Sequence, residues 1–248
     1  MRYCLIGEKL SHSKSKEIHG YFGYDYTLAE LKREELKKFI RSVKEGAYGG
    51  FNVTIPYKKE IIPYLDEVDK FAEKIGAVNT VAVKGGKLVG YNTDFFGMKC
   101  ALERAGISLK DKNVLILGTG GTSETAKAVA ESEGAKSVKK VGRTSEINYE
   151  NCYELKDTEV VINTTPVGTY PETDEKPIEL KKFPRLKGAF DCVYNPRETL
   201  LLKEAKSLGV KCSGGTVMLI AQALKAEEIW TGKTADNRLI EELLEKFI

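Results

Sequence analysis

Residues 113–131, NVLILGTGGTSETAKAVAE, decide the fold of the second half of the chain. Val114–Leu117 is an apolar run that predicts a buried strand, and Ser123–Glu131 has the apolar spacing of a helix. Between them, Gly118 and the Gly120-Gly121 pair predict a turn through which the backbone can approach a pyrophosphate at a helix N-terminus. The spacing departs from G-x-G-x-x-G, and glycine also serves such a turn for steric reasons alone. The turn therefore favours dinucleotide binding without establishing it.

Further strands and helices alternate after this turn, which predicts a doubly wound parallel sheet of the Rossmann type and strengthens the dinucleotide interpretation. Beyond Gly214-Gly215 the pattern is helical. The predicted elements are strands Ser137–Val141, Val160–Asn163 and Ala189–Val193, and helices Leu200–Leu208, Val217–Trp230 and Asp236–Phe247.

The first half of the chain has the same alternation, which predicts a second, mostly parallel α/β sheet. Because the two closing helices extend no sheet, we expect at least one to return to this first domain. We therefore expect a discontinuous domain, residues 1–94 and 219–248, and a dinucleotide-binding domain, residues 95–218. The predicted elements of the first half are strands Tyr3–Ile6, Tyr24–Leu28, Gly50–Thr54, Val78–Val83 and Leu88–Tyr91, a hairpin turn at Lys84–Lys87, and helices Glu34–Val43, Asp69–Ile75 and Phe95–Ala105.

Composition argues against a nucleic-acid or membrane partner. The formal net charge is +3, and the basic residues are spread along the chain instead of forming one block. The N-terminus lacks the apolar core of a signal peptide, and no run is long enough to span a membrane. The five cysteines form no CxxC pair, so we expect reduced thiols, a cytoplasmic protein and no metal site.

The residues after strand Ser137–Val141 indicate which dinucleotide binds. An acidic residue there usually holds the ribose of NAD, whereas a 2′-phosphate needs a cation. The chain has Arg143 followed by Thr144, a pair suited to a phosphate, with Lys139 or Lys140 as possible helpers. This favours NADP, although a solvated surface arginine is the alternative interpretation.

Three polar stretches of the first half begin or follow at the C-terminal ends of predicted strands, the edge at which open α/β sheets place ligands. They are Ser11–Ser15, Asn52–Lys58, and Gly76–Thr80 with Gly90–Asp94 close behind. Their hydroxyls, amides and Asp–Lys pair suit a small polyhydroxylated acid, with Lys58 carrying the proton of an alcohol oxidation.

Each of these residues also has a purely structural interpretation. Asp94 could cap the helix that follows it, Lys58 could be a surface lysine in a first helical turn, and Ser13 and Ser15 could cap the next helix. The two histidines, His12 and His19, have no matched nucleophile, and we interpret both as structural.

Together with other motifs along the chain, these stretches make the sequence resemble the shikimate dehydrogenases over essentially its whole length. The resemblance lies in S-H-S-x-S at Ser11, N-V-T-x-P-x-K at Asn52, G-A-V-N-T at Gly76, N-T-D at Asn92, the G-x-G-G turn, N-x-T-P-x-G at Asn163, D-x-x-Y-N-P at Asp191 and G-G-x-x-M-L-x-x-Q at Gly214. It implies NADP-dependent, reversible reduction of 3-dehydroshikimate to shikimate, a step of aromatic amino-acid biosynthesis.

The resemblance also implies a role for each site residue. Lys58 and Asp94 would be the catalytic pair. Ser13, Ser15, Thr54 and Tyr194 would hold the substrate carboxylate, and Asn79 and Gln222 would bind ring hydroxyls. Around the nicotinamide we expect Asn163, Thr164, Thr165, Val193, Gly215 and Met218.

The chain departs from the family pattern at two positions. Lys16 replaces a usual proline, and Glu124 replaces a usual basic residue after the glycine turn, which removes a possible phosphate contact. Two alternatives stay open: an NAD-using quinate/shikimate dehydrogenase, and a non-catalytic nucleotide-sensing module of the same fold. We expect a monomer or a homodimer.

Overall fold

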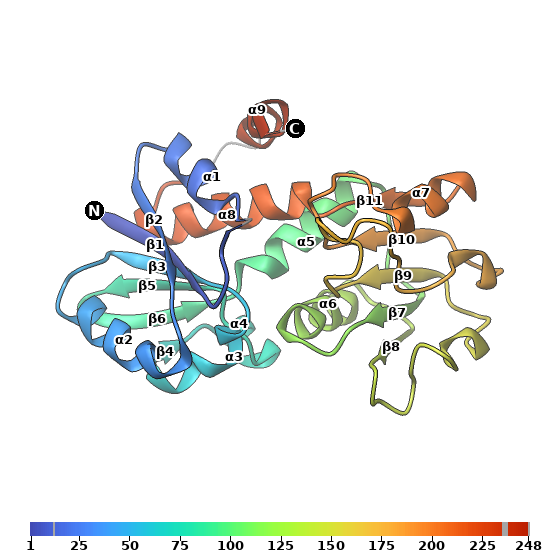
Figure 1. The fold of residues 1–248 in the computed structure, drawn as a ribbon, viewed down its shortest axis with the longest axis horizontal. Helices are drawn as coiled ribbons and strands as arrows, with labels where there is room; N and C mark the ends of the chain where they lie inside the picture. The colour runs from blue at the N-terminus through green and yellow to red at the C-terminus, as the bar shows by residue number, and fades with distance from the viewer. Residues whose placement is uncertain (12, 235–237, 248) are drawn as a thin grey trace. The chain divides into compact units, whose positions relative to one another are not determined.

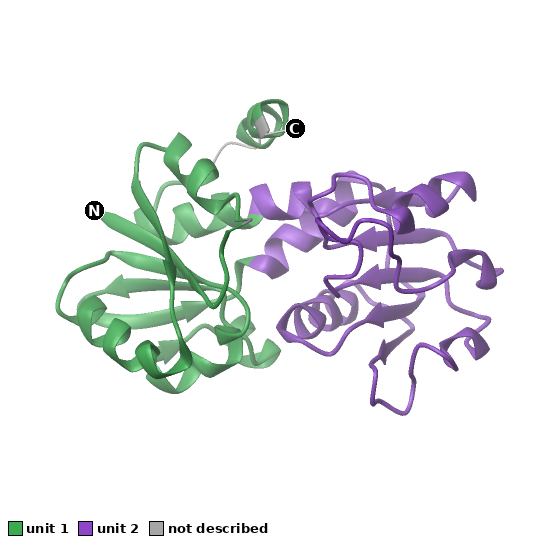
Figure 2. Cartoon of the chain, in the orientation of Figure 1, with its two compact units in different colours: residues 1–93, 222–248 green, residues 94–221 purple. Residues whose placement is uncertain are grey.

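The chain forms two compact units in a computed structural model, which describes residues 1–11, 13–234 and 238–247 (Figures 1 and 2). Unit 1 comprises residues 1–93 and 222–248, and unit 2 comprises residues 94–221. Two helices, α5 (Thr93–Arg104) and α8 (Thr216–Thr231), belong partly to each unit. His12 and the start of the closing helix at Asp236 lie outside the described residues.

Unit 1 is built on one six-stranded mixed sheet. The strands follow the order β2-β1-β3-β5-β6-β4. β1 pairs in parallel with β2 and β3, whereas β5 runs antiparallel to both β3 and β6. Its other elements, with their bounds, are β1 (Arg2–Gly7), α1 (Ser15–Tyr21), β2 (Asp25–Glu30), η1 (Arg33–Glu35), α2 (Leu36–Lys44), β3 (Gly50–Val53), α3 (Tyr57–Glu60), η2 (Ile62–Tyr64), β4 (Glu67–Val68), α4 (Lys70–Ile75), β5 (Thr80–Lys84), β6 (Lys87–Tyr91) and α9 (Arg238–Phe247).

The reversal of β5 follows from a predicted two-residue hairpin. Gly85 and Gly86 both have positive φ, 57° and 81°, the backbone conformation that a type I′ turn requires and that glycine adopts at little cost. The turn brings Lys84 opposite Lys87 in the register of β5 and β6. This hairpin is why the sheet is mixed instead of wholly parallel.

The sheet of unit 1 is apolar on both faces, as a sheet covered by helices must be. Alternate residues of β1 point to opposite sides: Cys4 and Ile6 pack with α2, and Tyr3 and Leu5 pack with Tyr26 and Trp230.

Trp230 attaches the end of α8 to the sheet of unit 1. Its indole N–H donates to Val81 O at 3.0 Å, and its ring stacks on Tyr3 with 4.4 Å between ring centroids. Gly50 makes room for the indole, because a Cβ atom there would meet Trp230 Nε1 and would lie 2.7 Å from Val81 O. The helix that carries Gln222 is thereby fixed in unit 1.

Unit 2 is a parallel five-stranded sheet with the order β11-β10-β9-β7-β8. The chain leaves β7 for β8 on one side and returns to β9 on the other, so the strand order reverses beside β7. This Rossmann-like order confirms the predicted fold class. The elements are β7 (Asn113–Leu117), α6 (Gly121–Ser132), β8 (Ser137–Val141), η3 (Cys152–Glu154), β9 (Val160–Asn163), η4 (Leu180–Lys182), β10 (Gly188–Asp191), α7 (Leu200–Ser207) and β11 (Lys211–Ser213).

Helices cover this second sheet on both faces. The connections from β8 to β9 and from β9 to β10 hold only the short 3-10 turns η3 and η4. Apolar residues from α5 and α6 pack on one face of the sheet, and residues from α7 pack on the other. In the described part of the chain, no helix combines the length and apolar character needed to cross a membrane.

We expect Gly50→Ala to lower the free energy of unfolding by about 1–3 kcal/mol, the usual cost of overpacking. The added methyl would press on the Val81 carbonyl and displace Trp230. Urea unfolding of both proteins measures the change. Gly20→Ala is the matched control, since a Cβ in that α1 position meets nothing within 4 Å. Equal stability of the Gly50→Ala variant and the wild type would contradict this account.

Candidate active site

One edge of the sheet in unit 1 collects the three polar stretches. β1, β3 and β6 end there, and β5 begins there because it runs antiparallel to its neighbours. Asn79 precedes β5, so the expectation that every stretch lies at the C-terminal end of a strand is wrong for this residue. The Asn79 backbone N–H donates to Tyr91 O at 3.0 Å, and its carbonyl accepts from Val53 N at 2.8 Å. Antiparallel pairing thus brings Asn79 to the expected edge.

The Asn79 side chain lies at the centre of a buried hydrogen-bond network in unit 1. Its Oδ1 accepts from the Thr93 backbone N–H at 2.7 Å, and its Nδ2 donates to Thr93 Oγ1 at 3.0 Å. The Thr93 hydroxyl also lies 3.1 Å from Thr80 Oγ1 and 3.4 Å from Gln222 Oε1. All four side chains are buried, at 0–8% exposed. Asn79 and Gln222, 143 positions apart in the sequence, are therefore joined through one hydroxyl.

The network continues from Thr80 through Asn52 to Tyr26 on β2. Asn52 Nδ2 donates to Thr80 Oγ1 at 3.0 Å, and Asn52 Oδ1 accepts from the Tyr26 hydroxyl at 2.6 Å. Burial raises the pKa of Tyr26 well above its ordinary value, while a hydrogen bond with Ser15 acts in the opposite direction. Tyr26 therefore keeps its proton and can donate it to Asn52.

The predicted serines have a local role as well. Ser13 Oγ accepts from the Ser15 backbone N–H at 3.2 Å, so Ser13 does satisfy a donor at the start of α1. Ser15 is the first residue of α1 and is 8% exposed, whereas Ser13 is half-buried. A capping role for Ser13 is compatible with binding, because a hydroxyl can accept one bond and donate another.

Thr54 and Lys58 follow β3 in a tight turn. The Thr54 backbone N–H donates to Ile6 O at 2.9 Å, and Gly7 permits this approach, since a Cβ there would lie 2.6 Å from Thr54 Cγ2. Lys58 is the second residue of α3, its side chain is half-buried, and its carbonyl accepts from Val78 N at 2.8 Å. The first-turn position expected of Lys58 is therefore present, but the residue is not a fully solvated surface lysine.

Asp94 lies one residue inside α5 and is 7% exposed. The Thr93 N–H at the start of this helix is satisfied by Asn79 Oδ1, a partner distant in sequence. Asp94 is therefore a buried carboxylate in the first turn of the helix and does not precede it as a cap would.

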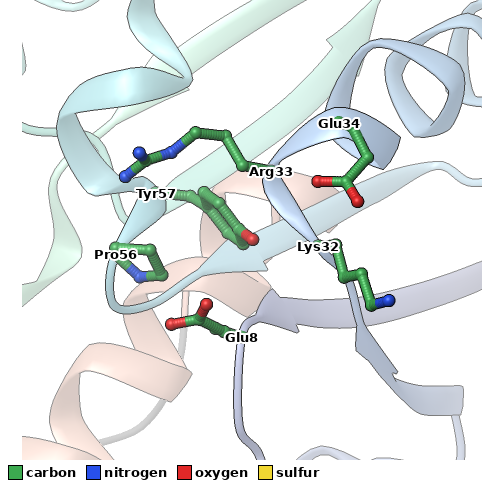
Figure 3. Close-up of a pocket in the computed structure, with 6 residues that line it drawn as sticks. All are labelled: Glu8, Lys32, Arg33, Glu34, Pro56 and Tyr57. Atoms are coloured by element: carbon green, nitrogen blue, oxygen red, sulfur yellow. The ribbon is translucent and has the colours of Figure 1, made fainter.

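A separate pocket of about 420 Å³ opens beside this edge of unit 1 (Figure 3). Its charges largely balance, and Arg33 already pairs with Glu60 at 2.6 Å. The buried Tyr57 lines it and donates to Leu31 O. None of the sequence-predicted site residues lines it, so we do not assign the substrate to this pocket. The lining residues are Glu8, Lys32, Arg33, Glu34, Pro56 and Tyr57.

In unit 2, the glycine turn lies where the strand order reverses, the position at which open α/β sheets bind nucleotides. Gly118 has a φ of 110°, and a Cβ there would lie 2.7 Å from Thr164 Oγ1, so the turn requires glycine. A Cβ at Gly120 would meet nothing within 4 Å. α6 begins at Gly121, so the open space beside Gly120 adjoins unpaired N–H groups of a helix N-terminus. These features fit a pyrophosphate.

Arg143 and Thr144 are exposed just beyond β8. In the described part of the chain, Arg143 forms no ion pair. Lys140 is engaged: its ammonium lies 3.1 Å from both carboxylate oxygens of Glu124. The expectation that Lys140 could assist Arg143 is therefore not supported, and the charge of Glu124 in the first turn of α6 is neutralised.

A second buried network organises the loops after β9 and β10. Asp191, which is fully buried, accepts from Asn163 Nδ2 at 2.9 Å, Val193 N at 3.1 Å and Thr199 Oγ1 at 2.7 Å. Asn163 Oδ1 accepts in turn from the Thr165 N–H at 3.0 Å and the Thr165 hydroxyl at 2.7 Å. Asn163 is 0% exposed, so its side chain supports this loop from within instead of facing a ligand.

The other predicted nicotinamide residues surround the same loops. Thr164 Oγ1 donates to Leu117 O at 2.6 Å, and Gly215 N donates to Val193 O at 3.0 Å. Gly215 requires glycine, since a Cβ there would meet the Cys192 carbonyl. Met218 is buried in the core cluster of unit 2. Tyr194, which we expect to hold the substrate carboxylate, follows Val193 directly, and burial raises its pKa.

Comparison with known proteins agrees with these features. A family model described as the shikimate dehydrogenase substrate binding domain matches residues 5–81, and one described as the shikimate 5′-dehydrogenase C-terminal domain matches residues 215–245. The NADP(+) shikimate dehydrogenase of Clostridium beijerinckii is 40% identical, over 99% of this chain and 97% of its own. The chain belongs to the shikimate dehydrogenase family.

Solved structures extend the match to three dimensions. A chorismate mutase/shikimate 5-dehydrogenase fusion protein from Clostridium acetobutylicum superposes with a TM-score of 0.94, at 37% identity over 99% of this chain and 96% of that one. The shikimate 5-dehydrogenase of Thermus thermophilus, solved with NADP(H) and shikimate, gives a TM-score of 0.87 at 31% identity, with 100% of both chains covered. The resemblance inferred from the motifs is confirmed.

Sequence reasoning missed several residues that hold the family's site together. Asn52, Thr80 and Thr93 stand inside motifs that the resemblance used, so their small polar character was a usable signal. Tyr26 gave no signal, because a tyrosine in a strand is ordinary core material. Asp191 was part of a motif, but its partners at Asn163 and Thr199 became evident only from the fold.

We expect the titration of the buried Asp191 carboxyl to make the free energy of unfolding depend on pH. Burial raises the pKa of its carboxyl, so the native state binds the proton more tightly than the unfolded state does. Its stabilising contribution is therefore fully present below the unfolded pKa and is lost as the pH rises through the folded pKa. The difference in free energy of unfolding between the wild type and Asp191→Asn should fall as the pH increases from about 4 toward neutrality.

Urea unfolding at several pH values measures this difference. Asp174→Asn, which removes an exposed carboxylate, is the control and should give a curve parallel to the wild type. Parallel curves for Asp191→Asn as well would show that the buried carboxyl does not titrate differently in the two states.

Proposed function

We propose that this chain is an NADP-dependent shikimate dehydrogenase that reversibly reduces 3-dehydroshikimate to shikimate, a step toward aromatic amino acids. The observation that carries the proposal is a match to NADP(+) shikimate dehydrogenase over 99% of the chain, in a protein that retains Lys58, Asp94 and the Asn79–Gln222 network. Residues 1–94 and 219–248 form the substrate-binding domain, and residues 95–218 form the NADP-binding domain. The two compact units support this division.

The substrate is held by groups that match its chemistry. The hydroxyls of Ser13, Ser15, Thr54 and Tyr194 receive the carboxylate, and Asn79 and Gln222 bind ring hydroxyls. An amide can donate and accept at once, and the buried network restricts both amides to one orientation, so little entropy is lost when the ring binds.

The cofactor is held by the turn and the loops of the second domain. Gly118, Gly120 and Gly121 receive the pyrophosphate, and Arg143 with Thr144 receives the 2′-phosphate. Around the nicotinamide lie Thr164, Thr165, Val193, Gly215 and Met218, with Asn163 supporting their loop from beneath. NADPH, when bound, supplies the hydride.

Lys58 and Asp94 are the catalytic pair. As the carbonyl carbon of 3-dehydroshikimate accepts hydride, its oxygen gains negative charge, and the Lys58 ammonium donates the proton that completes the alcohol. In the reverse direction the same nitrogen takes the proton back. Asp94 orients Lys58 and accepts a hydrogen bond from a neighbouring hydroxyl.

The two alternatives are not favoured. An NAD-using quinate/shikimate dehydrogenase would be expected to carry an acid after β8, where this chain has Arg143. A non-catalytic sensing module would not need both Lys58 and Asp94. We further propose that the protein works in the cytoplasm, with its five cysteines as free thiols, as a monomer or a homodimer.

Lys58→Ala should lower kcat by roughly 100- to 10,000-fold with little change in the KM for 3-dehydroshikimate, because the lost interaction is proton transfer. The assay follows absorbance of NADPH with 3-dehydroshikimate, in which the wild type should consume the cofactor. Lys59→Ala, the neighbouring exposed lysine, is the control. A large rise in the KM for 3-dehydroshikimate at unaltered kcat would assign Lys58 to binding alone. The proposed function would be refuted by a wild type that is inactive with shikimate and with quinate, whether NADP or NAD is supplied.

Arg143→Ala should raise the KM for NADPH by roughly 10- to 100-fold, the cost of losing a charge-assisted contact to a phosphate, and should leave the KM for NADH nearly unchanged. Lys136→Ala is the control for net charge. It removes an exposed cation just before the start of β8, whereas Arg143 follows the end of that strand. Equal losses with both cofactors would refute the 2′-phosphate assignment. Running the wild type with shikimate and quinate tests the width of substrate use.

A further inference from the structure

A buried histidine and a buried glutamate pair with each other inside unit 1, away from the residues assigned above. His19 Nδ1 lies 2.6 Å from Glu227 Oε1, and the two residues are 0% and 7% exposed. Their outer atoms, His19 Nε2 and Glu227 Oε2, are buried and have no hydrogen-bond partner within the described residues. Each unpartnered atom costs free energy, so the pair is poor at stabilising the fold.

A packed apolar pair of similar volume would serve stability as well or better. What a buried polar pair can supply instead is a directional contact that fixes one arrangement of two elements. The elements joined here are α1, which carries His19, and α8, which carries Glu227.

Both helices also carry a residue assigned to the substrate. Ser15 precedes His19 by four positions, so the two share the buried face of α1. Gln222 precedes Glu227 by five positions on α8. The contact between His19 and Glu227 therefore sets the separation of the two helices on which Ser15 and Gln222 stand.

Tyr26 makes a second connection between the pair and the substrate residues. The His19 ring stacks on Tyr26 with 4.2 Å between centroids and 11° between planes. Tyr26 donates to Asn52, from which the network runs through Thr80 and Thr93 to Gln222. This series of contacts therefore begins on α8 at Glu227 and ends on the same helix at Gln222.

We propose that His19 and Glu227 are positioning residues that fix Ser15 relative to Asn79 and Gln222 and thereby set the affinity for the substrate. This inference rests on the substrate roles proposed above for those three residues. Neither member of the pair is assigned a contact with substrate or NADPH, so their loss acts on binding. The interactions with carboxylate and ring hydroxyls are equally present before and during hydride transfer, so the effect should fall on KM and spare kcat.

The decisive variant is His19→Phe with Glu227→Leu. It removes the polar contact, keeps a ring against Tyr26 and leaves no buried charge, so the protein should unfold at a temperature near that of the wild type. We expect the KM for shikimate to rise roughly 10-fold or more, while kcat and the KM for NADP stay within about 3-fold. His19→Phe with Glu227→Gln, which likewise leaves no buried charge, should act in the same direction and serves if the first double variant does not fold.

Two further variants separate positioning from a general structural effect. Glu227→Gln keeps an acceptor for His19 Nδ1–H and should retain a KM for shikimate near that of the wild type. Glu228→Gln, next along α8, breaks a less buried pair with Lys225 and is the control. A KM for shikimate unchanged in the folded His19 variants, or raised only in step with the KM for NADP, would overturn the inference.

Ser15→Ala and Gln222→Ala distinguish this failure from failure of the proposed function. Both should raise the KM for shikimate in the same assay. If neither does, the substrate assignment is wrong and the inference falls with it. If both do while the folded His19 variants keep the wild-type KM, the inference alone is wrong and the proposed function stands.

Discussion

The hydrogen bond from the Thr93 backbone N–H to Asn79 Oδ1, 2.7 Å long and fully buried, is the contact on which the rest of the site depends. It joins the residue before β5 to the first residue of α5, so the direction of one strand determines where that helix begins. Asp94 follows directly in the chain, and Thr93 carries the hydroxyl that reaches Gln222. Without the antiparallel β5, Asn79 would stand at the other edge of the sheet.

Both units bury polar side chains, and different chemical groups satisfy them in each unit. In unit 1, neutral amides and hydroxyls satisfy one another around Asn79, so a polar cluster can be buried without leaving an uncompensated charge. In unit 2, the carboxyl of Asp191 receives three donors and holds the loops after β9 and β10. Each network lies at a sheet edge behind residues assigned to a ligand, and each limits how far those residues can move.

The resemblance to a family and the individual geometry of this chain answer different questions. The family assignment explains why Lys58, Asp94 and the serines occur together in one sequence. The structure adds features that the family assignment does not specify, including the Glu124–Lys140 pair at the first turn of α6 and the buried His19–Glu227 pair. The first offsets a charge that would otherwise face a phosphate, and the second joins two helices that both carry substrate residues.

Sequence by itself determined most of the strands, though not β4 or β11, most of the helices, the glycine turn and the residues with the chemistry of a dehydrogenase. These depend on local propensity and on short motifs, which adjacent residues specify. It did not determine that β5 is antiparallel to β3 or that Asn163 faces inward. Nor did it reveal the partners of Tyr26, His19 and Asp191. Those outcomes depend on contacts between residues far apart in the chain, because hydrogen bonding and burial act through space and only the folded chain decides which groups meet.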